Sequence, residues 1–232
     1  MVKTIEVFLK KGEISKEDFI AKLKAHGEGA KAIKGIKGYI VNEVVPSPPR
    51  LDIAQFRIPL LDAIVETFYD DIEALRAVRD GDNMKAFLAS RADFVGSMKT
   101  LLTLEHIIID PGVENRPSVK NFAFLNRRPG MTLPEFLNEW IVLHGPMSLK
   151  VPHQGGFVPN EVLAVIPNSD GFDLIDTDYI EGVAVANFVS TETQALMRAS
   201  DEAKEWFKHG GVTFGTVFGQ SARETVIIAP KA

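Results

Sequence analysis

The feature that most constrains the fold of this chain is an internal duplication. The dipeptide His-Gly stands at residues 26–27 and again at 144–145, and in both places Asn-Glu-Val follows fifteen residues later. The last β-rich runs match as well, residues 105–109 against 224–228. Every match has an offset of 118 or 119 positions, so we interpret the chain as two copies of one folding unit.

Hydrophobic periodicity predicts the same order of elements in each copy, β-α-β-β-α-β, which is the order of a ferredoxin-like unit. The strands predicted for the first copy are Lys3–Lys10, Gly38–Val45, Leu60–Tyr69 and Leu101–Ile109, and its helices are Ser15–His26 and Asp71–Ser90, with Gly81 as a candidate break. The strands predicted for the second copy are Ser118–Arg127, Gly156–Ile166, Tyr179–Val189 and Arg223–Ala229, and its helices are Thr132–His144 and Thr191–His209.

Two units of this kind can bury each other's sheets. A four-stranded ferredoxin-like sheet carries its helices on one face and leaves its other apolar face bare, so two such sheets can cover each other. We therefore expect an α+β protein in which residues 1–110 and 117–232 are tandem ferredoxin-like halves of an internal α/β-barrel pair. Pro111–Pro117 is the natural linker between them.

Composition argues against several classes of function. The formal net charge is −5 with no basic stripe, which argues against nucleic-acid binding. The absence of cysteine excludes disulfides, thiolate metal sites and thiol nucleophiles. No two-histidine-plus-carboxylate spacing falls on one element, so we expect no metal. Since no apolar run reaches the roughly 18 residues that cross a bilayer, and the N-terminus does not resemble a signal peptide, we expect a soluble, cytoplasmic protein without membrane partners.

One helix of the second copy carries the strongest local signals. Thr132 is a candidate N-cap, followed by a proline and a glutamate in the first turn. Residues at helical spacing form its apolar face: Leu133, Phe136, Leu137, Trp140, Ile141 and His144. Gly145-Pro146 is expected to end the helix. This arrangement would place the His144 imidazole at the end of an apolar stripe, facing the core or a pocket.

This segment resembles the EthD domain family, whose helix has the form F-x-x-x-W/Y followed by H-x-P. The motif is carried here by Phe136, Trp140, His144 and Pro146. The first copy keeps only the phenylalanine and the His-Gly pair, and it has Glu28 where the motif has proline. The resemblance therefore covers both halves, but only the second half carries the full motif.

The resemblance implies the dimeric α/β-barrel fold, with pockets between helices and sheet. EthD-like domains occur beside the degradation of organic pollutants and in aromatic polyketide and aromatic catabolic pathways. Relatives in the superfamily include cofactor-independent cyclases, dehydratases, decarboxylases, isomerases and monooxygenases, as well as haem-binding enzymes. The resemblance thus favours an enzyme of small-molecule metabolism without fixing the reaction.

Histidine 144 is the leading candidate for catalysis, because an imidazole can act as general acid or base at neutral pH. Trp140 and Phe136 could form walls for a planar substrate. The competing interpretation of His144 is a cap on helix carbonyls. His26, at the matching place in the poorer copy, is a second catalytic candidate and also supports that structural interpretation.

Four further residues are weaker candidates. Asn160, which matches Asn42, could orient a substrate carbonyl, or it could satisfy a neighbouring loop. Glu66 lies in the middle of a strand, where burial could raise its pKa to suit proton transfer; the competing interpretation is an exposed strand edge or a position at the barrel rim. Asp178 and Tyr179 could stand at a pocket rim or in a solvated loop.

We therefore predict a cofactor-independent enzyme, of lyase or isomerase type, acting on a small aromatic or cyclic oxygenated compound. His144 would transfer a proton in a decarboxylation, dehydration or isomerisation. The alternatives are a non-enzymatic small-molecule binding or stress-type protein, and an oxygen- or haem-dependent oxidoreductase. The chain could act alone or pair again as a homodimer.

Overall fold

The computed structural model describes residues 1–47, 53–55, 59–112, 119–166 and 180–230. The first half contains β1 Val2–Lys10, α1 Lys16–Glu28, β2 Gly38–Val45, β3 Ala63–Tyr69, α2 Ile72–Asp80, α3 Asp82–Ala89 and β4 Val95–Glu105, with short 3-10 turns at Gly29–Ala32 and Ser90–Asp93. The second half contains β5 Val119–Arg127, α4 Leu133–Leu137, a π-helical turn Asn138–His144, α5 Gly145–Met147, a 3-10 turn Ser148–Lys150, β6 Gly156–Ile166, β7 Gly182–Phe188, α6 Thr191–Ala199, α7 Asp201–Thr213 and β8 Phe214–Ile228.

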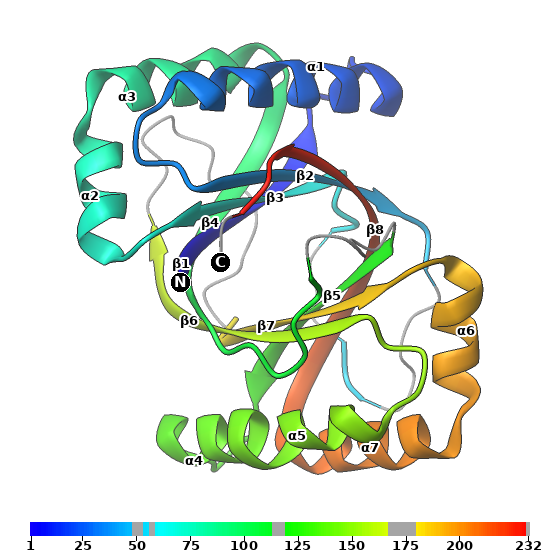
Figure 1. Cartoon of the computed structure of the whole chain (residues 1–232). Helices are drawn as coiled ribbons and strands as arrows, with labels where there is room; N and C mark the ends of the chain where they lie inside the picture. Colours follow the sequence, from blue (N-terminus) through cyan, green and yellow to red (C-terminus); the bar gives the residue numbers. More distant parts are fainter. Residues whose placement is uncertain (48–52, 56–58, 113–118, 167–179, 231–232) are drawn as a thin grey trace.

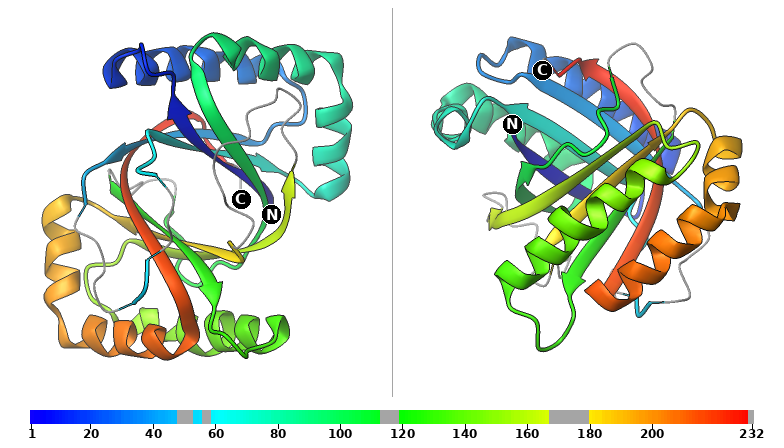
Figure 2. Two further views of the ribbon diagram at one scale, coloured as in Figure 1. Left: turned by 180° about the vertical axis from the view of Figure 1, so that it is seen from behind. Right: turned by 60° about the horizontal axis from the view of Figure 1, so that its bottom comes forward.

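The eight strands close into one antiparallel barrel in the order β1-β3-β2-β8-β5-β7-β6-β4. Each half supplies four adjacent strands, and the halves are joined where β2 pairs with β8 and where β4 pairs with β6. The helices of the two halves lie on opposite outer sides of the barrel (Figures 1 and 2). This architecture confirms the predicted α+β fold with two ferredoxin-like halves.

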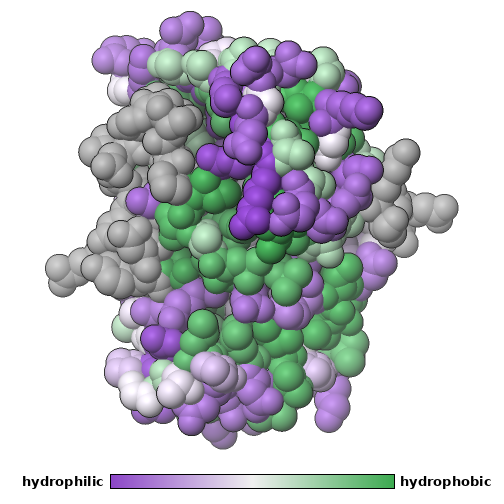
Figure 3. Space-filling view, turned by 90° about the vertical axis from the view of Figure 1, so that its left-hand side faces the viewer, coloured by the Kyte–Doolittle hydropathy of each residue, from purple (hydrophilic) through white to green (hydrophobic). Residues whose placement is uncertain are grey.

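The apolar residues form layers inside and outside the barrel. One cluster, which includes Ile5, Phe122 and Val183, fills the barrel interior and replaces the bare sheet faces that each half would expose alone. Other clusters lie between the sheet and the helices, around Phe19 in the first half and around Trp140 in the second. On the outside, apolar residues gather near the middle of the face drawn in Figure 3.

Several element boundaries differ from the predicted ones. Strand β3 begins at Ala63 rather than Leu60, β4 covers Val95–Glu105 rather than Leu101–Ile109, and β8 begins at Phe214 rather than Arg223. The early parts of β4 and β8 contain glycines, which weaken a strand signal in the sequence. Pairing along the full length of β1 and β5 nevertheless holds them in the sheet.

The helices after β3 and β7 are both interrupted. The predicted break at Gly81 separates α2 from α3. The predicted helix Thr191–His209 is also two helices, because the Ser200 side chain accepts a hydrogen bond from the backbone N–H of Ala203 and so caps α7. That second helix continues to Thr213.

The predicted end of the helix at Gly145-Pro146 is wrong. Thr132 is the N-cap, as predicted, and forms a capping box with Glu135, but the helical run continues past Pro146 to residue 150. The run contains a π turn, in which the N–H of Gly145 donates to the carbonyl of Trp140 five residues earlier. Because a π turn is wider than an α turn, it takes up the proline that would clash in a regular helix. His144 therefore lies inside a helical run, not at its C-terminus.

Within the described residues, no helix is long and apolar enough to cross a membrane.

Candidate functional site

A cavity of about 150 Å³ lies between the sheet and the helices of the second half. Most of its wall is aromatic: Trp140, Phe157, Phe188, Trp206, Phe207 and Phe214. Its floor is made of small residues from three strands: Ala123, Ala184, Ala186 and Gly219. The polar lining residues are few: Asn121, His144, Gln194 and Arg198. An apolar pocket with a few polar groups is the usual form of a small-molecule site.

The floor shows why the cavity opens in this half. Ala123 on β5 is paired with Ala184 on β7 and with Gly219 on β8. At the corresponding positions of the first half, the register pairs Glu6 on β1 with larger residues on β3 and β4. The methyl groups and the glycine of the second half therefore leave space that side chains occupy in the first.

The first half fills the equivalent space with a buried ion pair. The guanidinium of Arg91 lies 3.1 Å from the carboxylate of Glu6, and both side chains are buried. The same guanidinium lies over the Phe8 ring, 5.4 Å from its centroid. At the duplication offset, Arg91 corresponds to Gly210, and adding a Cβ at Gly210 would already meet the rings of Phe214 and His144. The two halves thus share the same backbone fold but differ in the side chains that lie between the helices and the sheet.

His144 is buried in the cavity wall, where only 4% of it is exposed. Its ring stacks on Trp206 with centroids 5.3 Å apart, and its edge meets Phe214. Its backbone carbonyl accepts a hydrogen bond from the Trp206 indole N–H. Packing on both sides therefore fixes the orientation of the imidazole.

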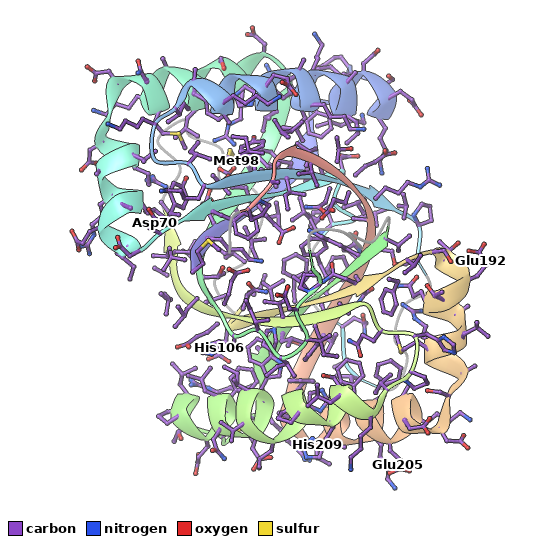
Figure 4. All side chains as sticks on the ribbon, in the orientation of Figure 1. Asp70, Met98, His106, Glu192, Glu205 and His209 are labelled. Carbon is purple, nitrogen blue, oxygen red and sulfur yellow. The ribbon has the colours of Figure 1, made fainter. Side chains whose placement is uncertain are left out.

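A second imidazole adjoins the first. The Nδ1 atoms of His144 and His209 are 3.2 Å apart, which is hydrogen-bonding distance, so one of them donates and the other accepts. His209 lies on α7 beside the helical run that carries His144, and it is half-buried at the outer surface (Figure 4). A half-buried histidine next to a buried one can exchange protons between the cavity wall and water.

Trp140 lines the cavity and is fully buried. Its ring lies against Gly182 so closely that any Cβ at that position would overlap it. The indole nitrogen of Trp140 has no hydrogen-bond partner among the described residues. Phe136, by contrast, does not line the cavity. It stacks behind Trp140 with ring centroids 5.4 Å apart, so the structure places it as a support and not as a wall.

Asn160 does not line the cavity either. Its amide donates to the backbone carbonyls of Val158 and Val183, at 2.8 and 2.9 Å. Phe157, three positions earlier on β6, does line the cavity, and alternation along a strand turns Asn160 to the opposite face. Asn42 makes the corresponding bond in the first half, to a backbone carbonyl of β3. The matched asparagines therefore hold strands together inside the barrel.

Glu66 lies in a buried ionic cluster inside the barrel, which corrects both interpretations made from its sequence position. Its carboxylate is 2.8 Å from the Lys3 ammonium and 2.5 Å from that of Lys120, and it accepts a hydrogen bond from the Asn42 amide. Burial favours a higher pKa for Glu66, but the two ammonium groups outweigh it and hold that pKa well below its usual range. Glu66 is neither exposed nor a carboxyl with a raised pKa.

His26 occupies the filled half. Its Nε2 lies 2.8 Å from the carbonyl of Phe87, and its ring lies tilted against the ring of that residue, with centroids 3.9 Å apart. Burial lowers the pKa of His26. These contacts hold α1 against α3, so the role of His26 in this half is structural. Asp178 and Tyr179, together with most of the predicted linker, lie outside the described residues.

Sequence reasoning missed several lining residues, among them Asn121, Gln194, Arg198 and Trp206. None of them forms a recognisable motif. A comparison of the two copies position by position would have pointed to the site, since Ala123 and Gly210 in one copy replace Glu6 and Arg91 in the other. Loss of bulk at matched buried positions is the signal of a cavity.

The cavity limits the groups that could be held there. An engineered apolar cavity of about 150 Å³ in another protein is large enough for benzene, so a haem, whose macrocycle is many times larger, does not fit. Among the described residues there is also no cluster of three or more side chains placed to hold a metal ion. A single ring fits a cavity of this volume.

No protein-family model and no curated protein matches the sequence. Solved structures are nevertheless similar. An anthrone oxidase-like protein has a TM-score of 0.65 at 12% identity, over 100% of this chain and 95% of its own. A monooxygenase-like protein from Fusobacterium nucleatum has a TM-score of 0.66 at 9% identity, over 100% and 95%. Another from Lactobacillus acidophilus has a TM-score of 0.61 at 10% identity, over 97% and 94%.

Likeness at such low identity shows a shared fold and does not assign a reaction to this chain. All three structures match almost the whole chain, which includes both halves of the barrel. With its two halves in one polypeptide, this chain is a protein of the dimeric α/β-barrel fold, as its resemblance to the EthD-like domains implies.

Proposed function

We propose that the second-half cavity binds a single aromatic or cyclic ring bearing oxygen, and that His144 transfers a proton to or from that ring. The observation that carries this proposal is one buried imidazole in the wall of an aromatic cavity of single-ring size. Flat aromatic walls favour a planar ligand by stacking. The imidazole can serve as acid or base near neutral pH.

The histidine pair gives the proton a route. When His144 takes a proton from the ligand at Nε2, its Nδ1 proton can pass to Nδ1 of His209, 3.2 Å away. His209 is half-buried and can release a proton to water. The pair therefore returns His144 to its neutral form without opening the cavity. Decarboxylation, dehydration and isomerisation all need such a proton transfer.

A second candidate function starts from the same step. Once a phenol or a cyclic ketone loses a proton, its electron-rich anion can be oxidised by O₂. This route is supported by the description of one fold neighbour as anthrone oxidase-like and of two others as monooxygenase-like. It differs from the first candidate in that it consumes oxygen.

Hydrogen–deuterium exchange tests the shared step without knowledge of the product. The protein would be incubated in D₂O with single-ring phenols and cyclic ketones. Deuterium at the carbons ortho and para to the phenol hydroxyl, or α to the ketone carbonyl, would be measured by mass spectrometry. We expect exchange by the wild type and a loss of about 10² to 10⁴-fold in His144→Gln. His26→Gln, at the matched position, is the control and should exchange like the wild type.

The outcomes separate the candidates. Ligand binding without exchange or product would indicate a binding protein and overturn the catalytic proposal. Equal exchange by wild type and His144→Gln would remove His144 from the chemistry. Oxygen uptake with a bound ligand would select the oxidation, and a product formed without uptake would select the lyase or isomerase reaction.

A further inference from the structure

We infer that the mouth of the barrel is a second binding site, which takes a small primary ammonium compound with a short apolar body. A cavity of about 130 Å³ lies there, and its wall includes Met1 and Pro230, near the two ends of the chain. The mouths of β-barrels are among the places where small-molecule sites occur. This inference does not depend on the function proposed for the second-half cavity.

The two cavities lie on opposite faces of the sheet. Val185 and Asn187 of β7 line the barrel mouth, whereas Ala184 and Ala186 of the same strand line the second-half cavity. Alternate residues of a strand point to opposite faces. Ile107, which is 57% exposed, is part of the wall at the barrel mouth, so this cavity opens to solvent. Ligands of the two cavities therefore do not compete for the same space.

Acidic groups outnumber basic groups in the wall of the barrel-mouth cavity. Its carboxylates and side-chain ammonium groups belong to Glu66, Glu105, Asp110, Glu224, Lys3 and Lys120. Even with the α-ammonium of Met1 counted, four negative charges face three positive ones. Each lysine ammonium already lies between two carboxylates, at 2.5 to 3.2 Å, and Glu66 is shared by both lysines. The cavity therefore favours a cation over an anion.

A buried hydrogen-bond acceptor in this wall has no partner. Asn187 is 2% exposed, and its amide oxygen accepts no hydrogen bond from any described residue. The amide nitrogen lies toward β6, since a Cβ added at the paired residue Gly156 would come within 2.7 Å of it. The oxygen, on the other side of the planar amide, points away from Gly156. An unpaired buried acceptor is costly, so a donor supplied by a ligand would stabilise it.

Two other buried asparagine oxygens lack a partner among the described residues, those of Asn42 and Asn160. Neither of these residues lines the barrel-mouth cavity. The combination of an unpaired acceptor with an excess of carboxylates is therefore particular to Asn187 and its surroundings, and it points to a ligand.

An ammonium head on a short apolar body matches the two kinds of surface in this wall. An ammonium group carries one positive charge and three N–H donors, which suit an amide oxygen close to carboxylates. The remaining wall is apolar: Ile40, Phe68, Ile107, Val158 and Val185. The cavity of about 130 Å³ is slightly smaller than one that holds benzene, so it suits a body of a few carbon atoms.

An NMR titration of the protein measures binding of n-butylammonium, of its neutral isostere 1-butanol and of butyrate. We expect the wild type to bind butylammonium at least about tenfold more tightly than either of the other two. The side-chain amide signal of Asn187 should shift with butylammonium.

Three variants locate the acceptor. Asn187→Leu removes it and should lose at least about tenfold in affinity for butylammonium while its affinity for 1-butanol changes little. Asn187→Asp keeps an acceptor and adds a negative charge, so it should bind butylammonium at least as tightly as the wild type. Asn121→Leu, an asparagine of the second-half cavity, is the matched control and should bind butylammonium like the wild type.

Several results would overturn the inference: no binding of butylammonium by the wild type, equal binding of 1-butanol, tighter binding of butyrate, or displacement of butylammonium by an equal concentration of K⁺. Unchanged affinity in Asn187→Leu would do the same. If that variant does not fold, the comparison of wild type with Asn187→Asp decides. Binding of phenols should be equal with and without butylammonium, so failure of this site leaves the function proposed for the other cavity in place.

Discussion

Filling the cavity floor should stabilise the protein and weaken ligand binding, and Gly219→Ala is the smallest change that does so. Nothing lies within 4 Å of where the new Cβ would stand, and the backbone of Gly219 is not in the left-handed region. The substitution therefore adds a methyl group without a clash. Gly215→Ala on the same strand is the control, because its Cβ would lie 2.5 Å from the carbonyl oxygen of Arg127.

The magnitude follows from the unfolded chain. Replacing glycine by alanine at a compatible position stabilises by about 0.4–1 kcal/mol because it restricts the unfolded chain, whereas a methyl group with no neighbour within 4 Å gains little from packing. A gain of about 1 kcal/mol raises the melting temperature by about 2–4 °C for a chain of this size. For Gly215→Ala the clash with backbone should instead cost about 1–3 kcal/mol.

Thermal unfolding of the two variants, with and without a single-ring ligand, checks both parts. Gly219→Ala should melt above the wild type and show a smaller ligand-induced shift, since the methyl group occupies ligand space. Gly215→Ala should melt lower and keep the shift relative to its own baseline. A Gly219→Ala protein that melts as low as Gly215→Ala would refute the view that open space adjoins this position.

Three further predictions concern the buried charges. Lys120→Met removes the cation shared by the buried carboxylates of Glu66 and Glu224, and should lower the free energy of unfolding in urea by about 3–5 kcal/mol. Lys204→Met, in an exposed ion pair, is the control and should lower it by less than about 1 kcal/mol. The pKa of Glu66 is lower in the folded protein than in the unfolded chain, so the ionised carboxylate stabilises the fold above about pH 4.5 and this stabilisation is lost as the pH falls. The urea midpoint of the wild type should therefore drop more steeply in acid than that of Glu66→Gln. Arg91→Ala should destabilise by about 3–5 kcal/mol in urea unfolding, because it leaves the buried Glu6 carboxylate without its cation. The double variant Glu6→Ala with Arg91→Gly should cost less than the sum of the single changes.

Local signals predicted the elements well where propensity and tertiary pairing agree. The N-cap at Thr132 and the strand Gly38–Val45 lie where the sequence predicts them. The errors concern glycine and proline, each of which occurs in more than one kind of local structure. Glycines in β8 resemble a turn in sequence, but one of them lies in a strand at the cavity floor. Pro146 resembles the end of a helix, but it lies within a helical run that a π turn has widened.

The duplicated β-α-β-β-α-β pattern was enough to predict the architecture, because it leaves two bare sheet faces with one simple way to cover them. Helical periodicity also singled out His144 and Trp140, because it directs both toward the interior. The repeated order of elements alone could not determine which half holds the cavity. That depends on the bulk facing each sheet at matched positions, which strand pairing brings together from distant parts of the chain.

Contacts made in the closed barrel set the charge of Glu66, the direction in which the Asn160 side chain points and the neighbour of His144. Glu66 stays ionised because Lys120, 54 residues away, donates to it from the other half of the barrel. Asn160 turns away from the cavity because the register of β6 assigns alternate residues to opposite faces. His144 adjoins His209 because α7 packs beside the helical run, a contact 65 residues apart in sequence. Such properties arise from neighbours that only the closed barrel supplies.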